Sequence, residues 1–200
     1  GDEHRIFVQD GRAIFARTLT IGGGHVTLDI VHALRTPLAE AERIKTLYGT
    51  VLKAQSDQHD VFTYAITGVG EGLEQRSTKA DLARIIQSRM AQLLHLVRDQ
   101  LASAGLLDET AARIVLCGGG SEISGLQSFA EGVFRRPVRE GRPQTISGLP
   151  PLYASAAFAG AVGVLRAVAE SAADDLPGAL GLDAPGGYMG RIGQWLKDGF

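Results

Sequence analysis

The stretch Ile114-Val-Leu-Cys-Gly-Gly-Gly-Ser-Glu-Ile-Ser-Gly-Leu126 predicts a short strand, a turn of three glycines and the start of a helix. Because Gly118, Gly119 and Gly120 carry no side chains, a planar ring or a phosphate can approach the backbone N–H groups there. The stretch has neither the GxGxxG spacing of a dinucleotide-binding turn nor the Gly-Lys-Ser/Thr ending of a P-loop. Taken alone, it is equally consistent with a tight strand-to-helix connection that needs a positive φ angle.

On both sides of this stretch, strand and helix patterns alternate, which indicates an α/β protein. Asp10-Gly11 between two β-rich runs is a strong hairpin signal. We predict strands over 5–9, 12–20, 61–66, 113–117 and 137–140, the strand over 113–117 being buried. We predict helices over 25–34, 38–48, 78–103, 124–134 and 149–169, with 53–60 as a loop.

The composition excludes several classes of function. Apolar residues make up 44% of the 200 residues and charged residues 21%, as in an ordinary globular protein. The net charge of −2 argues against a dedicated nucleic-acid-binding protein, which would need a basic surplus to neutralise phosphates. The single cysteine, Cys117, forms no internal disulfide and suits a reducing compartment. The five histidines have no metal-ligand spacing, so we predict no metal site.

Glu42 and Lys45 lie on one face of the helix predicted over 38–48, because residues at i and i+3 are neighbours. One reading is a solvated ion pair that stabilises the helix by a few tenths of a kcal/mol. The other is that Glu42 binds the ribose hydroxyls of an adenosine and Lys45 lies along its ring. Gly118, Gly119 and Gly120 would then face the base.

The composition changes after residue 170. Residues 171–187 are rich in Gly, Pro and Asp and predict a flexible linker, whose roughly eighteen residues have an r.m.s. span of about 23 Å. Residues 188–200 predict a short amphipathic helix, too short to span a bilayer. Its apolar face consists of Met189, Ile192, Trp195, Leu196 and Phe200. With Arg191 and Lys197 near lipid phosphates, this helix is typical of a membrane-surface anchor, although a helix docked on the protein's own core is the alternative.

Together these motifs resemble the actin-like ATPase superfamily and, within it, the cell-division family FtsA. The resemblance rests on 20–30, 34–49, 114–126 and the linker and terminal helix, and it covers nearly all of the chain. It implies that residues 1–170 form the α/β, actin-like (ribonuclease-H-like) second half of the fold, including an inserted subdomain. The flexible linker and the C-terminal amphipathic helix follow.

The resemblance implies ATP as the ligand, with Mg²⁺ in the intact protein. We expect both phosphate-binding loops to lie outside this chain, so the chain alone should bind ATP weakly or not at all. No residue here is a credible hydrolytic base, and we predict no catalytic residue.

The resemblance further implies self-association into filaments and tethering of the FtsZ ring to the cytoplasmic membrane at the division septum, together with other division proteins. The FtsZ C-terminal peptide would dock on the inserted subdomain. Arg89, expected on the exposed face of the long helix, is the main candidate for this contact, and Met90 and Tyr153 are further ones. We expect charge reversal at Arg89 to weaken peptide binding without lowering the melting temperature.

Two other functions fit an actin-like fold. One is an enzyme such as a sugar kinase or a phosphatase, which would need a catalytic loop bearing an aspartate. The other is a scaffold such as a pilus-assembly ATPase. Lipid binding that depends on the last thirteen residues would separate both from the FtsA reading.

Overall fold

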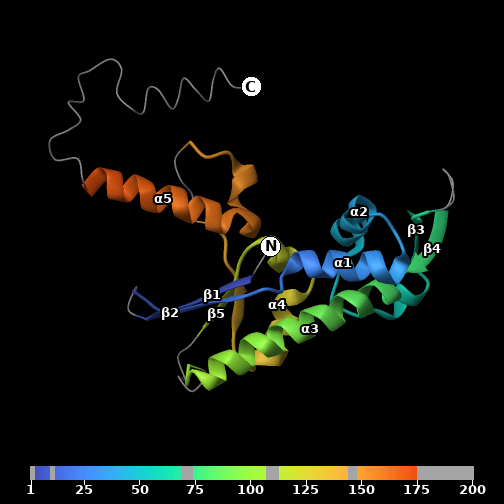
Figure 1. Ribbon diagram of the computed structural model, residues 1–200, viewed down its shortest axis with the longest axis horizontal. Coiled ribbons are helices and arrows are strands. Elements are labelled where there is room, and N and C mark those ends of the chain that lie inside the picture. The colour runs from blue at the N-terminus through green and yellow to red at the C-terminus, as the bar shows by residue number, and fades with distance from the viewer. Residues whose placement is uncertain (1–2, 10–11, 69–73, 107–112, 144–147, 175–200) are drawn as a thin grey trace, which may run out of the picture.

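The computed structural model describes residues 3–9, 12–68, 74–106, 113–143 and 148–174 (Figure 1). The terminal helix predicted over 188–200 and residues 175–187 of the predicted linker lie outside these residues. Within the described part, no helix is long and apolar enough to cross a bilayer.

Strands and helices alternate through the described chain, as the sequence indicates. The strands are β1 (Glu3–Gln9), β2 (Arg12–Leu19), β3 (Val61–Ala65), β4 (Glu74–Thr78), β5 (Ile114–Leu116) and β6 (Val138–Glu140). The α-helices are α1 (Gly23–Leu34), α2 (Leu38–Tyr48), α3 (Lys79–Ser103), α4 (Leu126–Phe134) and α5 (Ala159–Asp174). Four 3₁₀ turns join them: η1 (Gln55–Gln58), η2 (Gly119–Glu122), η3 (Pro151–Ala154) and η4 (Ala156–Phe158).

Four elements differ from the predictions. Strand β4 was missed, because its sequence EQRST has no apolar residue and forms a strand only by pairing with β3. The region predicted as a helix over 149–169 begins as η3 and η4, since Pro150 holds the backbone extended. Helix α5 then continues to Asp174, four residues into the predicted linker. The predicted loop over 53–60 contains η1.

The described strands form three two-stranded sheets. The pairs β1–β2 and β3–β4 are antiparallel, and β5–β6 is parallel. The strand predicted over 113–117 is confirmed as β5, but the prediction that it is buried is wrong: Val115 is 43% exposed and Cys117 is exposed. Because β5 pairs with β6 alone among the described strands, one of its edges has no strand partner there, and it is less covered than a central strand would be.

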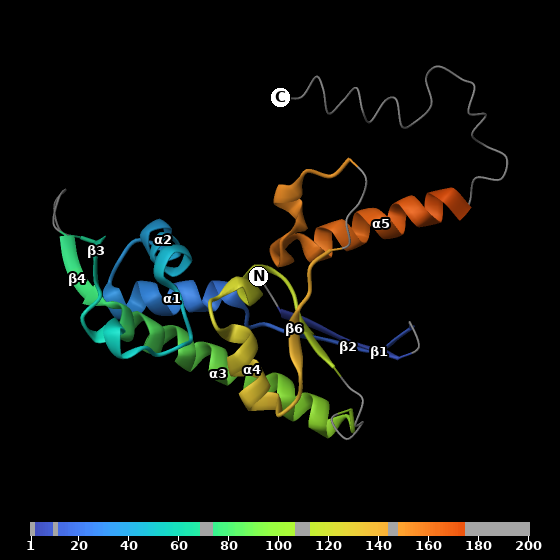
Figure 2. The same cartoon turned by 180° about the vertical axis from the view of Figure 1, so that it is seen from behind.

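The core lies where α1 and α4 pack against α3 and where α2 packs against α1. Figures 1 and 2 show α1 lying along α3, with α2 and the β3–β4 hairpin at one end and the β1–β2 hairpin at the other. The apolar residues that recur at helical spacing along α3 form its buried face, apart from Ile85, which is partly buried. The buried residues of that face are Leu82, Ile86, Met90, Leu93, Leu94 and Val97.

Helix α5 lies apart from this core (Figures 1 and 2). Val162 is buried, but Val164, Leu165 and Val168 are more than half exposed. Helix α5 contacts η4, and η4 in turn packs against η2. This contact positions the triple-glycine turn described next.

Candidate functional site

The triple-glycine turn over 118–120 lies against the N-terminus of α1. A Cβ atom placed on Gly23 would lie 3.5 Å from the Cα of Gly120, so the two backbones are in van der Waals contact. The turn is held in place by Gly118, whose N–H donates a hydrogen bond of 2.7 Å to the carbonyl of Ala156. The hydroxyl of Ser121 donates to the carbonyl of Gly118, also at 2.7 Å. Two glycine-rich turns about a hundred residues apart therefore meet at one place.

Glu42 and Lys45 form the predicted pair, and a buried threonine completes it. Lys45 Nζ lies 2.8 Å from the Glu42 carboxylate. The Thr27 hydroxyl donates to Glu42 Oε2 at 2.6 Å and accepts from Lys45 Nζ at 2.8 Å. Thr27 comes from α1 and is 3% exposed, so it fixes both charged groups of α2 relative to α1. Sequence reasoning missed Thr27 because no local spacing links it to a pair on another helix.

The electrostatics keep Glu42 ionised. Burial acts to raise the pKa of Glu42, but the hydrogen bonds from Lys45 and Thr27 and the charge of Lys45 outweigh burial, so the net pKa is lowered. Glu42 is thus a fixed acceptor, and Lys45 a donor beside it. This arrangement suits a ligand that carries hydroxyl groups.

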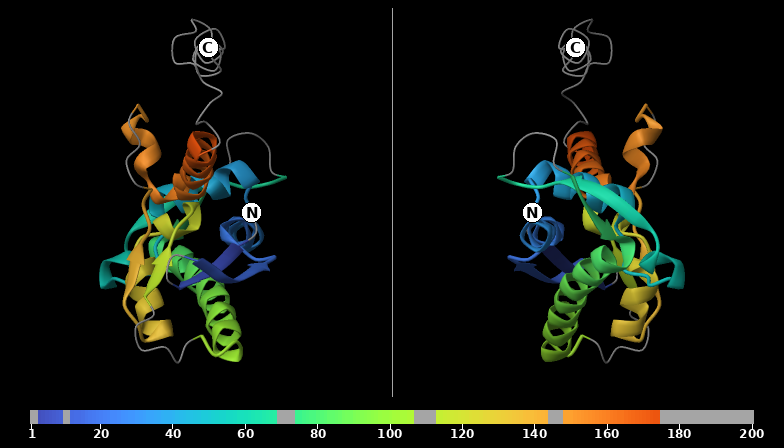
Figure 3. Two further views of the ribbon diagram at one scale, coloured as in Figure 1. Left: turned by 90° about the vertical axis from the view of Figure 1, so that its left-hand side faces the viewer. Right: turned by 90° about the vertical axis from the view of Figure 1, so that its right-hand side faces the viewer.

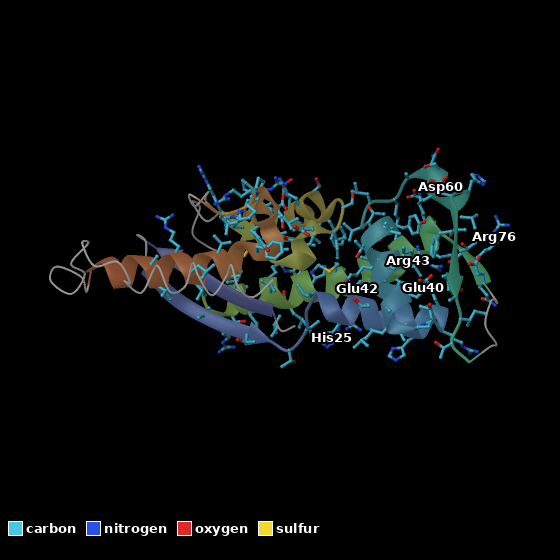
Figure 4. The ribbon with its side chains drawn as sticks, turned by 90° about the horizontal axis from the view of Figure 1, so that it is seen from above. His25, Glu40, Glu42, Arg43, Asp60 and Arg76 are labelled. Carbon is cyan, nitrogen blue, oxygen red and sulfur yellow. The ribbon has the colours of Figure 1, made fainter. Side chains whose placement is uncertain are left out.

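A cavity of about 570 Å³ opens between α1 and α2 and includes Glu42 in its wall. Its lining is mostly apolar and consists of Gly24, His25, Thr27, Leu28, Leu38, Ala39 and Glu42. Figure 4 shows His25 and Glu42 on the two neighbouring helices. The volume falls in the range of small-molecule sites. The glycines over 118–120 do not line this cavity but adjoin it through Gly23.

His25 is a second residue that sequence reasoning missed. The backbone N–H of Gly22 donates a hydrogen bond of 3.2 Å to its Nδ1 atom. His25 also lines the cavity, so its ring lies within reach of a ligand bound there.

Arg43, between Glu42 and Lys45 in sequence, faces away from the cavity. It forms a two-point ion pair with Glu40, both contacts being 2.7 Å, and donates to the carbonyl of Thr63 in β3 at 3.3 Å. The hydrogen bond from Arg43 is the main cause that lowers the pKa of Glu40. Arg43 therefore fastens α2 to the hairpin and belongs to the structure rather than to the site (Figure 4).

The three candidate partner residues are not gathered on one surface. Tyr153 is 38% exposed in η3, where its ring packs edge-on against Phe158 at 5.0 Å. Helix α3, which carries Arg89 and Met90, lies on the opposite side of the molecule from η3 (Figures 1 and 3). Met90 is 4% exposed, so the expectation that it contacts a partner is not met: its apolar side chain faces the core.

Arg89 lies in a different environment from the expected exposed face. It is 24% exposed and forms a two-point ion pair with Asp29 of α1. A glutamate at position 89 would place two carboxylates side by side. The expectation that charge reversal at Arg89 leaves the melting temperature unchanged is therefore corrected. We now expect Arg89→Glu to lower the melting temperature as well.

Replacing Thr27 with the isosteric valine tests the cluster. Thr27→Val removes one donor and one acceptor from the charged pair, and we expect a loss of about 1–2 kcal/mol in the free energy of unfolding. The pKa of Glu42 should rise toward its ordinary value of 4.5, since a hydrogen bond that favours the ionised form is gone. Urea denaturation and an NMR titration of the Glu42 carboxyl measure the two effects.

The pH dependence has a defined sign. The lowered pKa of Glu42 stabilises the fold above about pH 4.5, and this stabilisation is lost as the pH falls through the pKa of Glu42 in the folded state. The effect of Thr27→Val on the free energy of unfolding should therefore shrink in acid. The control is Thr46→Val, an exposed threonine of α2 whose hydroxyl bonds only a backbone carbonyl. Its effect should stay within about 0.5 kcal/mol. Equal losses in both variants would contradict the role given to Thr27.

A comparison with known proteins identifies relatives of this chain. A model of the family "Cell division protein FtsA" matches residues 5–163. The chain is 34% identical over 199 residues to the cell division protein FtsA of Rhizobium meliloti (strain 1021), covering 96% of this chain and 44% of that protein. It is 30% identical over 208 residues to FtsA of Escherichia coli (strain K12), covering 98% and 48%. The chain thus spans about half the length of the curated relatives it matches.

Solved structures show the same fold at low sequence identity. MreB 5 of Spiroplasma citri bound to AMPPNP gives a TM-score of 0.63 at 15% identity, over 88% of this chain and 52% of that one. The PilM–PilN type IV pilus biogenesis complex gives 0.57 at 19%, over 82% and 42%. These likenesses confirm the predicted α/β, actin-like fold.

Proposed function

The chain belongs to the FtsA family of cell-division proteins, and we propose that it forms part of a protein that tethers the FtsZ ring to the cytoplasmic membrane. In this proposal residues 1–170 bind nucleotide and the FtsZ C-terminal peptide, and residues 188–200 bind lipid. The protein would act at the septum as a peripheral membrane protein that assembles with copies of itself. The family match over residues 5–163 is the observation that carries the proposal.

The nucleotide part rests on the cluster between α1 and α2. Glu42 offers carboxylate oxygens for the ribose hydroxyls, and the apolar wall of the cavity, including Leu28 and Leu38, suits a purine ring. The glycines over 118–120 let a ring approach the backbone beside Gly23. The solved MreB relatives were bound to AMPPNP and ADP, which supports an adenine nucleotide as the ligand. His25 and Thr27 join the predicted adenosine-binding residues.

The described residues fit the adenosine of ATP, and none of them is given a role in ATP hydrolysis. ATP, with Mg²⁺, would supply a phosphate chain, and the bound phosphates would favour one conformation of the protein. The described residues would contribute binding and orientation of the adenosine. The Thr27 hydroxyl donates to Glu42 and accepts from Lys45, which fixes both side chains, so neither group has to be ordered when a ligand arrives.

Recruitment of FtsZ to membranes by this chain tests the proposal. Purified FtsZ mixed with anionic liposomes should sediment with them when the chain is present and stay in the supernatant when it is absent. A chain ending at residue 187 is the matched control, since it keeps the globular part and lacks the predicted anchor. Failure of the chain to bring FtsZ down with liposomes, or equal recruitment by the shortened chain, would contradict the tether.

A further inference from the structure

Arg89 is held by two side chains from different parts of the fold. Its Nε atom donates to Asp29 Oδ2 at 2.6 Å and its Nη2 atom donates to Asp29 Oδ1 at 2.7 Å. Its Nη1 atom donates to Gln92 Oε1 at 2.7 Å. Asp29 lies on α1 and Gln92 one turn further along α3, so the guanidinium plane is fixed by both helices. A two-point contact with a carboxylate fixes direction as well as distance.

These contacts leave part of the guanidinium available. The group has five N–H donors, and three are used by Asp29 and Gln92. One N–H on each of Nη1 and Nη2 therefore remains. The Arg89 side chain is 24% exposed, so solvent and solutes reach it even though it is paired. A second carboxylate can bind these donors without displacing the first.

The pairing also removes a cost of binding. A free arginine side chain carries rotamer entropy, which a ligand would have to overcome when it orders the side chain. Asp29 and Gln92 have already ordered it. Asp29 adds a negative charge that opposes an acidic ligand, but the guanidinium lies between the two carboxylates and screens part of that repulsion.

We propose that Asp29 is a positioning residue for partner binding: together with Gln92 it orients Arg89 so that its remaining N–H groups receive a carboxylate of an acidic peptide. This inference rests on the proposed function, in which the FtsZ C-terminal peptide binds near Arg89. Asp29 is two residues from Thr27 on α1, so one helix carries both the nucleotide cluster and the support for the peptide contact.

Asp29→Asn tests the inference, because asparagine keeps the size of the side chain and loses the charge and one acceptor. We expect the affinity of the chain for a synthetic FtsZ C-terminal peptide, measured by fluorescence anisotropy, to fall about tenfold or more. The matched control is Asp99→Asn, the same change at an exposed carboxylate of α3 that pairs with Arg98. The affinity of that variant should equal that of the unaltered chain.

A double-mutant cycle separates positioning from general loosening of the fold. The same measurements are repeated with a peptide whose acidic side chains and C-terminus are converted to amides. If Asp29 acts through Arg89, the amidated peptide should bind weakly and equally to the unaltered chain and to Asp29→Asn. A loss of the same factor with both peptides would mean that the substitution only disturbs the fold, and would overturn the inference.

The remaining outcomes are also decisive. Unchanged affinity of Asp29→Asn for the acidic peptide would overturn the inference and leave the proposed partner standing. Increased affinity would show that Asp29 masks Arg89 instead of orienting it, which also overturns the inference. Absence of peptide binding by the unaltered chain would overturn the FtsZ part of the proposed function and the inference with it.

Discussion

Trp195→Ala combined with Phe200→Ala is expected to release the chain from anionic liposomes. Large aromatic side chains bury about 150–250 Å² each when fully covered. At about 25 cal/mol per Å², partial immersion of two such rings gives about 3–5 kcal/mol. Their loss should therefore lower the partition coefficient by about two to four orders of magnitude. Sedimentation with vesicles, with the protein measured in pellet and supernatant, checks this.

The control keeps the length and charge of the segment. Gln194→Ala changes a residue of the predicted polar face and should leave sedimentation unchanged. Arg191 and Lys197 should add about 1 kcal/mol each on anionic lipid, so the unaltered chain should bind more weakly as salt rises. Full sedimentation of the double variant would refute the anchor and favour the alternative of a helix docked on the protein itself.

Gly118→Ala should lower the free energy of unfolding by about 2–3 kcal/mol, although no atom crowds the position. Gly118 has φ 91° and ψ 165°, a region open almost only to glycine. An alanine must move the backbone, and the hydrogen bond from Gly118 to the carbonyl of Ala156 is then lost. Because this bond fixes the turn to η4, the contact between Gly120 and Gly23 should loosen as well. Chemical denaturation measures the stability.

Gly119→Ala is the matched control one residue away. Gly119 does not have a positive φ angle, and a Cβ there would meet no atom within 4 Å. We therefore expect a change within about 0.5 kcal/mol, so the difference between the two variants isolates the conformation of Gly118. Equal stability of the two variants would show that the turn adapts and that residue 118 does not fix its position.

Much of the fold could be predicted from local sequence. Asp10-Gly11 indicated the first hairpin, because glycine accepts the positive φ angles of a tight turn. Pro37 and Gly49 lie at the two ends of α2, because proline has no N–H for a helix interior and glycine weakens a helix. The spacing of apolar residues in α3 gave its buried face, since a helix repeats every 3.6 residues. Strand β4 could not be predicted in this way, because its polar sequence has no apolar periodicity and only its pairing with β3 makes it a strand.

The roles of individual residues were harder to predict from the sequence than the helices and strands. The sequence identified Glu42 and Lys45 as a pair, because they share one helix, but it gave no sign of Thr27, fifteen residues before Glu42 on another helix. Arg89 was expected on an exposed face, and its partner Asp29 is sixty residues away in sequence. Met90 was expected at a surface although it continues the apolar face of α3.

The sequence by itself determined the family, the order of most elements and the chemical types present at the site, because backbone restriction and apolar periodicity act within a few residues. The tertiary structure alone decided that Gly23 meets Gly120, that Thr27 joins Glu42 to Lys45 and that Asp29 orients Arg89. Each of these contacts joins residues from separate elements. Such contacts arise when apolar faces pack, and packing brings polar groups together that no sequence spacing relates.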